Sequence, residues 1–256
     1  SSKLTPIKYN ENKGSAQCKS SVIFCAMRAD GTTTIKAKKS RNHTEILCKY
    51  LKLPISVKEN KNYDEIKIKK VTNIKILNYN IPSDISSSAF FIVLTALSKN
   101  SELIIKNVNI NSSRIGVITI LKKMGVNIVI SNQKIYKGEK IADIKIKSTK
   151  NLRSINCPPE LNSGAIDEFL LIFLVAAKAK GISFFSNLSE LNQKESPRLM
   201  WAEKILKKIG IKTYSTKDSI KIFGNPNLNL DISKNIVIKN YLKDHRVFMT
   251  SVIAGL

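Results

Sequence analysis

Histidine, cysteine and long apolar runs are all scarce in this sequence, and each scarcity excludes a class of protein. The 256 residues include two histidines and four cysteines. No two cysteines form a C-x-x-C pair, so we expect no metal site. The longest apolar run, residues 169–177, is far shorter than the roughly 20 residues that cross a bilayer. The first residues lack a secretory signal. We therefore expect a soluble, cytoplasmic protein whose thiols are reduced and buried.

Acidic residues are also few: 19 Asp and Glu stand against 43 Lys and Arg, which gives a formal net charge of +24. Such a balance is compatible with nucleic-acid binding. However, aromatic residues make up only 7% of the chain and do not interleave with the basic ones, as a base-stacking platform requires. We interpret the charge as a solvated surface that attracts small anionic substrates, and keep nucleic-acid binding as an alternative.

The sequence does contain an internal repeat. Helical stretches rich in small residues begin 71, 79 and 81 residues apart, near Ser15, Ser86, Ala165 and Arg246. An amphipathic helix follows in the first three units, over residues 41–51, 114–124 and 198–209. Each of these units closes with a strand of alternating Ile and Lys, over residues 64–69, 142–147 and 218–223. The pattern predicts helix–strand–helix–strand–strand three times, followed by the first helix of a fourth copy.

Polar residues gather at the starts of these helices, where free backbone N–H groups and the helix dipole favour anions. Asp167 precedes a strongly apolar helix, where a carboxylate needs a polar partner or an exposed position. Lys194, Glu195 and Arg198 lie in a loop that enters the next helix, so opposite charges there can hold an anion and move a proton. The alternatives are ordinary N-capping serines, a first-turn acid at Glu195, a solvated helix residue at Arg198, and surface or core histidines.

Several of these segments resemble motifs of the 5-enolpyruvylshikimate-3-phosphate synthase family, in the family's order and with similar spacing. The matching segments are SAQCKS (15–20), SRNHTE (40–45), PSDISSSAF (82–90), the N-x-x-R-x-G pattern (111–116), IDE (166–168), ELNQKESPR (190–198) and DHRVFM (244–249). Four positions depart from the pattern: Asn192 replaces an Arg, Pro197 replaces an Asp that could orient Arg198, Asn42 replaces an Asp, and Leu170 stands where a Pro is common.

The resemblance implies an α/β fold of the enolpyruvyl transferase kind, an inverse α/β barrel-like architecture of two domains built from βαβαββ units. Residues 1–80 would be the last unit of the shikimate-3-phosphate domain, and residues 81–256 most of the second domain. The implied reaction joins the enolpyruvyl group of phosphoenolpyruvate to the 5-hydroxyl of shikimate-3-phosphate and releases phosphate, without a cofactor. It is a step of the shikimate pathway to chorismate and aromatic amino acids. Other family motifs lie outside these 256 residues, so we expect the chain alone to be inactive or nearly so.

The resemblance also implies a role for individual residues. Shikimate-3-phosphate would be bound by Ser15, Ala16, Gln17, Ser40, Arg41, Asp167 and Lys194. Phosphoenolpyruvate would be bound by Gln17, Arg198 and Arg246, since guanidinium groups suit phosphate and carboxylate. Asp167 would act as base on the attacking hydroxyl, Glu195 would handle protons at the enol carbon, and His245 would lie nearby as a third catalytic residue.

The family further implies a monomer with two small-molecule substrates and no nucleic-acid or membrane partner. Three alternatives stay open. One is the same fold acting on a UDP-linked amino sugar, as in the cell-wall enolpyruvyl transferase. The second is a basic nucleic-acid-binding protein. The third is a relative that keeps the fold without turnover, which the departures at Asn192 and Pro197 would favour.

Overall fold

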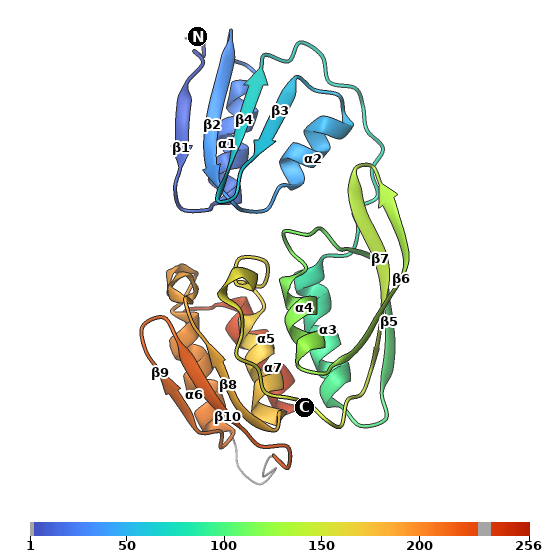
Figure 1. Ribbon diagram of the computed structural model, residues 1–256, viewed down its shortest axis with the longest axis vertical. Coiled ribbons are helices and arrows are strands. Elements are labelled where there is room, and N and C mark those ends of the chain that lie inside the picture. The colour runs from blue at the N-terminus through green and yellow to red at the C-terminus, as the bar shows by residue number, and fades with distance from the viewer. Residues whose placement is uncertain (1–2, 230–236) are drawn as a thin grey trace. The chain divides into compact units, whose positions relative to one another are not determined.

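The computed structural model describes residues 3–229 and 237–256, which divide into two compact units (Figure 1). Unit 1 comprises Ser1–Ile81 with Lys134–Ile141, and unit 2 comprises Pro82–Gln133 with Ala142–Leu256. Unit 2 differs from the predicted range 81–256 because residues 134–141 pack with unit 1, where Glu139 pairs with His43 at 2.5 Å. Every helix in the described part of the chain is too short or too polar to cross a membrane.

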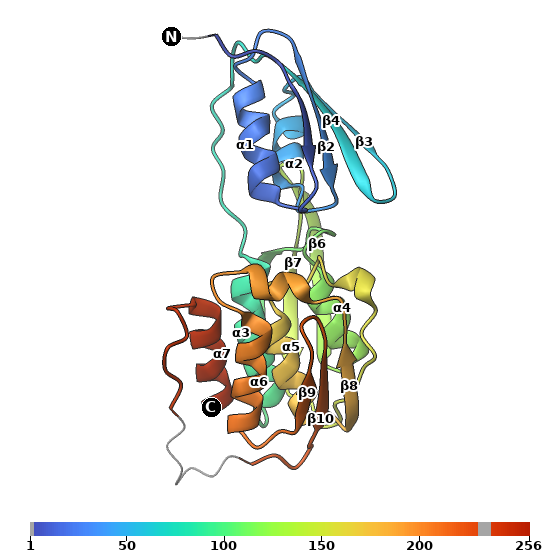
Figure 2. The same cartoon turned by 90° about the vertical axis from the view of Figure 1, so that its left-hand side faces the viewer.

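Unit 1 is a four-stranded sheet covered on one face by two helices (Figure 2). Its elements in chain order are β1 (Lys8–Glu11), α1 (Ala16–Ala26), β2 (Thr32–Lys38), α2 (His43–Tyr50), β3 (Ile55–Glu59) and β4 (Tyr63–Lys69). The strand order is β1-β2-β4-β3, in which β1 runs parallel to β2 and the other neighbours are antiparallel. Ile35 pairs with Ile66, and both are fully buried beneath the helices, whereas the alternating Lys residues face away. The period-two pattern therefore fixes which face the helices cover.

Unit 2 contains the second and third repeats and the first helix of a fourth. Its elements are α3 (Ile85–Leu97), β5 (Glu102–Asn109), α4 (Gly116–Lys123), β6 (Asn127–Tyr136), β7 (Glu139–Lys147), η1 (Pro159–Leu161), α5 (Phe169–Lys178), β8 (Gly181–Phe185), η2 (Ser189–Gln193), α6 (Arg198–Lys208), β9 (Thr213–Ser215), β10 (Ile220–Gly224) and α7 (His245–Gly255), of which β6 and β7 extend into unit 1 at their hairpin tip. The strands form two sheets, ordered β5-β7-β6 and β8-β10-β9.

The predicted repeat is confirmed, and the structure adds its first strand. In unit 1 this strand is β1, which pairs in parallel with β2. In unit 2 the equivalent segments form parallel bridges, between Ser83 and Val108 and between Asn156 and Phe184. Each repeat is therefore a βαβαββ unit. Two of the amphipathic helices begin two residues later than predicted, so Arg41 and Arg114 lie in the loops just before α2 and α4.

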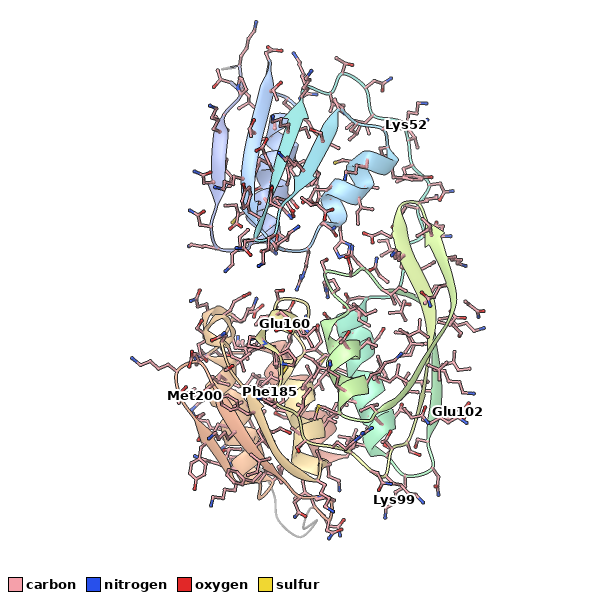
Figure 3. All side chains as sticks on the ribbon, viewed as in Figure 1. Lys52, Lys99, Glu102, Glu160, Phe185 and Met200 are labelled. Carbon is pink, nitrogen blue, oxygen red and sulfur yellow. The ribbon has the colours of Figure 1, made fainter. Side chains whose placement is uncertain are left out.

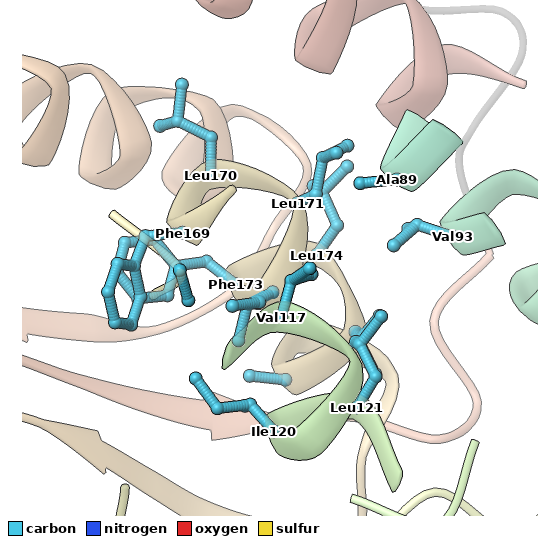
Figure 4. Close-up of a cluster of buried hydrophobic side chains, with 14 of the residues drawn as sticks. Ala89, Val93, Val117, Ile120, Leu121, Phe169, Leu170, Leu171, Phe173 and Leu174 are labelled. Carbon is cyan, nitrogen blue, oxygen red and sulfur yellow. The ribbon is translucent and has the colours of Figure 1, made fainter. Parts of the chain in front are cut away.

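The centre of unit 2 is α5, whose residues Phe169–Ala177 are all buried (Figure 4). A helix that is apolar on every side needs cover all round. Helices α3, α4, α6 and α7 and strand β10 all pack against it. The rings of Phe169, Phe173 and Phe185 meet with centroids 5.0–6.0 Å apart. Phe185, labelled in Figure 3, comes from β8 and ties that strand to the helix.

The prediction that the thiols are buried is correct for two cysteines and wrong for two. Cys48 and Cys157 are buried, and burial raises the pKa of each thiol to about 11. Cys18 and Cys25 are exposed, because the buried face of α1 is formed by Lys19, Ile23 and Ala26. All four are free thiols.

Gly116 is predicted to tolerate no side chain. A Cβ at this first residue of α4 would lie 2.6 Å from the Gly164 carbonyl carbon and 2.8 Å from the Leu161 oxygen, both backbone atoms that cannot rotate away. We expect Gly116→Ala to lower the free energy of unfolding of unit 2 by about 2 kcal/mol or more. Urea unfolding followed by the fluorescence of Trp201, the single tryptophan, measures this directly. Gly255→Ala, whose Cβ meets nothing within 4 Å, is the control, and equal stability of the two variants would contradict the prediction.

Candidate functional site

Arg198, the first residue of α6, is the centre of a charged cluster in unit 2. Only 2% of the residue is exposed, so its guanidinium needs partners inside the protein. Asp244 supplies them: its carboxylate lies 2.9 Å from Nε and 3.4 Å from Nη2. The same carboxylate accepts a hydrogen bond from Ser196 at 2.8 Å and caps α7 through the Arg246 N–H at 2.9 Å. One buried ion pair thus joins the start of α6 to the start of α7. The alternative of a solvated Arg198 is wrong.

The charge of Asp244 is maintained by these contacts. Burial by itself would raise the pKa of the carboxyl, but the hydrogen bonds from Arg198 and Ser196 and the Arg198 charge outweigh burial, so that the pKa of Asp244 is lowered. The carboxylate is therefore ionised at neutral pH and neutralises the buried guanidinium.

Asp167, just before α5, lies within reach of three cations. Its carboxylate is 3.6 Å from Arg198 Nη1, 3.8 Å from Lys194 Nζ and 3.9 Å from Arg246 Nη2. Arg246 Nη1 also donates to the Asp167 carbonyl oxygen at 3.1 Å. Lys194 and Arg246 keep part of their side chains exposed, 23% and 16%, so their charged ends can reach a ligand. The structure thus brings Asp167, Lys194, Arg198 and Arg246 together from three distant parts of the chain.

Two glutamates flank this cluster in different environments. Glu195 pairs with Arg198, but its side chain is 55% exposed to solvent. Glu168 is 1% exposed and accepts a hydrogen bond from Ser86, the residue to which Arg114 also donates. Burial raises the pKa of Glu168, more than its neighbouring hydrogen bonds and cations lower it. Glu195 therefore suits contact with a ligand, and Glu168 suits internal support.

The predicted residues of unit 1 form a second group, at the starts of α1 and α2. Ser15 caps α1 by accepting from the Cys18 N–H at 3.2 Å, and Ala16 and Gln17 form its first turn, which contains no acidic residue. Ser40 and Arg41 lie in the loop before α2, and the Arg41 carbonyl oxygen accepts a hydrogen bond from Lys19 of α1 at 2.9 Å. The Ser40 hydroxyl is buried and has no hydrogen-bond partner among the described residues, although such groups normally have one. This group therefore offers donors to an anion.

The contacts in the structure give little support to the predicted role of His245. It is the first residue of α7 and is exposed. Its catalytic role stays a prediction that rests on the family resemblance. The other histidine, His43, lies in unit 1 beside Glu139.

Two of the departures from the family pattern, Asn192 and Pro197, have structural roles. The Asn192 side chain donates to the Lys217 carbonyl oxygen at 3.0 Å and accepts from the Leu199 N–H at 3.3 Å, which holds the loop before α6. Pro197 is the N-cap residue of α6, where no N–H is needed. It offers no acceptor to Arg198, and Asp244 provides that acceptor from another helix.

Sequence reasoning missed the buried ion pair between Lys19 and Glu45, whose charged atoms are 2.6 Å apart. A signal was present, because Lys19 lies four residues before Ile23 and seven before Ala26, on the apolar face of its helix.

Replacement of Asp244 by Asn should destabilise unit 2 by about 3 kcal/mol at pH 7, because it leaves a buried guanidinium short of a counter-charge. Folding lowers the pKa of Asp244. The contribution of Asp244 to the free energy of unfolding is therefore complete above the pKa of the unfolded state, and it is lost as the pH falls through the pKa of the folded state. The difference between wild type and Asp244→Asn should therefore shrink below about pH 4.

Urea unfolding monitored at Trp201 at pH 7 and pH 3 measures both effects. The matched control is Glu102→Gln, which removes an exposed carboxylate from β5 (Figure 3) and should change stability little. A difference between wild type and Asp244→Asn that stays the same at both pH values would contradict the account.

The chain is similar to known proteins over its whole length. The chain matches the family model of EPSP synthase (3-phosphoshikimate 1-carboxyvinyltransferase) over residues 1–256. It is 36% identical to the 3-phosphoshikimate 1-carboxyvinyltransferase of Petrotoga mobilis and 37% identical to that of Hydrogenovibrio crunogenus. The two alignments cover 99% and 100% of this chain, respectively, and 57% of each relative. The EPSP synthase structure from Acinetobacter baumannii superposes with a TM-score of 0.84 at 34% identity, over 99% of this chain and 56% of that one. The enolpyruvyl transferase NikO from Streptomyces tendae, at 14% identity and a TM-score of 0.66, shares the fold. The chain spans little more than half the length of these relatives, and it belongs to the EPSP synthase family.

Proposed function

We propose that this chain takes part in the transfer of the enolpyruvyl group of phosphoenolpyruvate to the 5-hydroxyl of shikimate-3-phosphate. The observation that carries the proposal is the cluster of unit 2, in which Asp167 lies within 4 Å of Lys194, Arg198 and Arg246. The names of the relatives and the family model point to the same reaction. The proposal includes the two substrates as small-molecule partners, a cytoplasmic location and a monomeric protein.

The two groups of donors support an assignment of residues to each substrate. In unit 1 the free N–H groups of the first turn of α1, with Ser15, Gln17, Ser40 and Arg41, would bind shikimate-3-phosphate. In unit 2 Arg198 and Arg246 would bind phosphoenolpyruvate, because planar guanidinium groups pair with phosphate and carboxylate through two parallel hydrogen bonds. Asp244 holds Arg198 in a fixed orientation for this role.

Proton transfer is assigned to the two carboxylates that face the cations. Asp167 would accept the proton of the attacking 5-hydroxyl while the hydroxyl oxygen forms a bond to C2 of phosphoenolpyruvate. Glu195 would protonate C3 of phosphoenolpyruvate. The resulting tetrahedral intermediate loses phosphate when a proton leaves C3 again and the double bond is restored. Glu195 is 55% exposed and so can meet a ligand, and the adjacent cations would stabilise the charge that develops. Lys194 would bind the shikimate ring, and His245 would lie beside phosphoenolpyruvate.

Turnover can be tested in a chimera in which this chain replaces the segment of the Acinetobacter baumannii EPSP synthase that it matches. We expect phosphate release that requires both substrates, and a fall in kcat of about a hundredfold or more with Glu195→Gln, because a positioned acid–base group contributes that much. Glu203→Gln, on α6 and paired with Lys207, is the control and should retain activity.

Two outcomes would overturn the proposal. One is phosphate release by the folded chimera that is no greater than that of its Glu195→Gln variant. The other is turnover with UDP-N-acetylglucosamine in place of shikimate-3-phosphate, which would favour the amino-sugar alternative.

A further inference from the structure

Unit 1 contains a buried charge pair that the proposed reaction does not use. Lys19 lies in the second turn of α1 and is 0% exposed, and Glu45 in the first turn of α2 is 3% exposed. The Lys19 ammonium is 2.6 Å from Glu45 Oε1 and donates a hydrogen bond to the Arg41 carbonyl oxygen at 2.9 Å. Both charged groups are thus enclosed by the protein.

Stability does not explain the pair. Removing two charges from water costs several kcal/mol, and well-packed apolar residues in the same places are often as stable or more so. The Glu45 carboxylate is moreover incompletely satisfied, because Oε2 is buried without a hydrogen-bond partner among the described residues. The helix face that bears Lys19 continues into Ile23 and Ala26, so an apolar residue would extend the core of unit 1 at this position.

The pair holds a backbone carbonyl in place through a hydrogen bond, which an apolar residue cannot form. Arg41 lies between the end of β2 and the start of α2, in the loop that also carries Ser40. An ammonium group can donate to the Arg41 oxygen and still be neutralised by Glu45. The hydrogen bond between the Ser20 and Thr44 hydroxyls, 2.7 Å long, links the same two helices nearby. The loop is therefore fastened to the helix whose first turn carries Ala16 and Gln17.

We propose that Lys19 and Glu45 are positioning residues, which fix the backbone of Arg41 and Ser40 against the start of α1 so that both groups meet one phosphorylated substrate. The inference rests on the proposed function in so far as that substrate is shikimate-3-phosphate. Neither residue touches the substrate. Their effect is exerted on binding, because a loop that is ordered in advance loses less conformational entropy when the ligand is bound.

The test uses the whole chain with the double substitution Lys19→Met/Glu45→Met. Its matched control, Lys67→Met/Glu65→Met, removes one charge of each sign from an exposed pair on β4, 3.2 Å apart. Hydrogen exchange read by mass spectrometry should show at least roughly tenfold faster exchange over residues 39–42 in the first variant, and no change in the control. Protection of β2 and β4 in the same experiment reports that unit 1 is folded.

Titration calorimetry with shikimate-3-phosphate gives the second readout. The dissociation constant should rise about tenfold in Lys19→Met/Glu45→Met but not in the control, because the released loop must be ordered again when the ligand binds. If the backbone amides of β2 and β4 are not protected from exchange in Lys19→Met/Glu45→Met, the variant Lys19→Leu/Glu45→Gln is used in its place.

The inference is overturned if a folded variant lacking the pair matches the control in both loop exchange and affinity. A wild-type chain that does not bind shikimate-3-phosphate counts against the proposed function instead. In that case the exchange rate of residues 39–42 still decides whether the pair positions the loop.

Discussion

The buried guanidinium of Arg198 is the constraint on which the charged cluster of unit 2 depends. A charge that is 2% exposed must be neutralised within the fold, and Asp244 does so from the start of another helix while capping that helix. The starts of α6 and α7 are therefore held at one distance from each other. Asp167, before α5, is held to both, through Arg198 and through Arg246. The packing of α5, α6 and α7 thus sets the positions of Asp167, Arg198 and Arg246.

Unit 1 uses the same principle with different residues. A buried cation on one helix, Lys19, is neutralised by an acid in the first turn of the next helix, Glu45, and a backbone carbonyl is held as a result. In both units the repeat brings helix starts together, and helix starts are where backbone N–H groups remain free for an anion. A repeated βαβαββ unit therefore places several helix starts where an anion could be bound.

The order of helices and strands was predictable because its signals are local. Alternating Ile and Lys in each closing strand specifies both the strand and its buried face, as the pairing of Ile35 with Ile66 shows. Two helix starts were placed two residues early, at Arg41 and Arg114, because neither α2 nor α4 has a side-chain cap to mark its beginning. The burial of Arg198 was not predictable from its neighbours, since its main partner is 46 residues away. The exposure of Cys18 and Cys25 likewise depends on which face of α1 the sheet covers. The family motifs predicted the site residues, and only the structure could show the contacts that these residues make.

We infer that the starts of α6 and α7 form one anion site, organised by the pair of Arg198 and Asp244. Titration of the isotopically labelled chain with phosphoenolpyruvate, with backbone amide resonances followed by NMR, tests this inference. We expect saturable shifts concentrated at residues 196–199 and 244–247, with weaker binding in Arg198→Lys, because an ammonium cannot form the planar two-point contact. Shifts spread over the surface lysines, or equal affinity of wild type and Arg198→Lys, would contradict it.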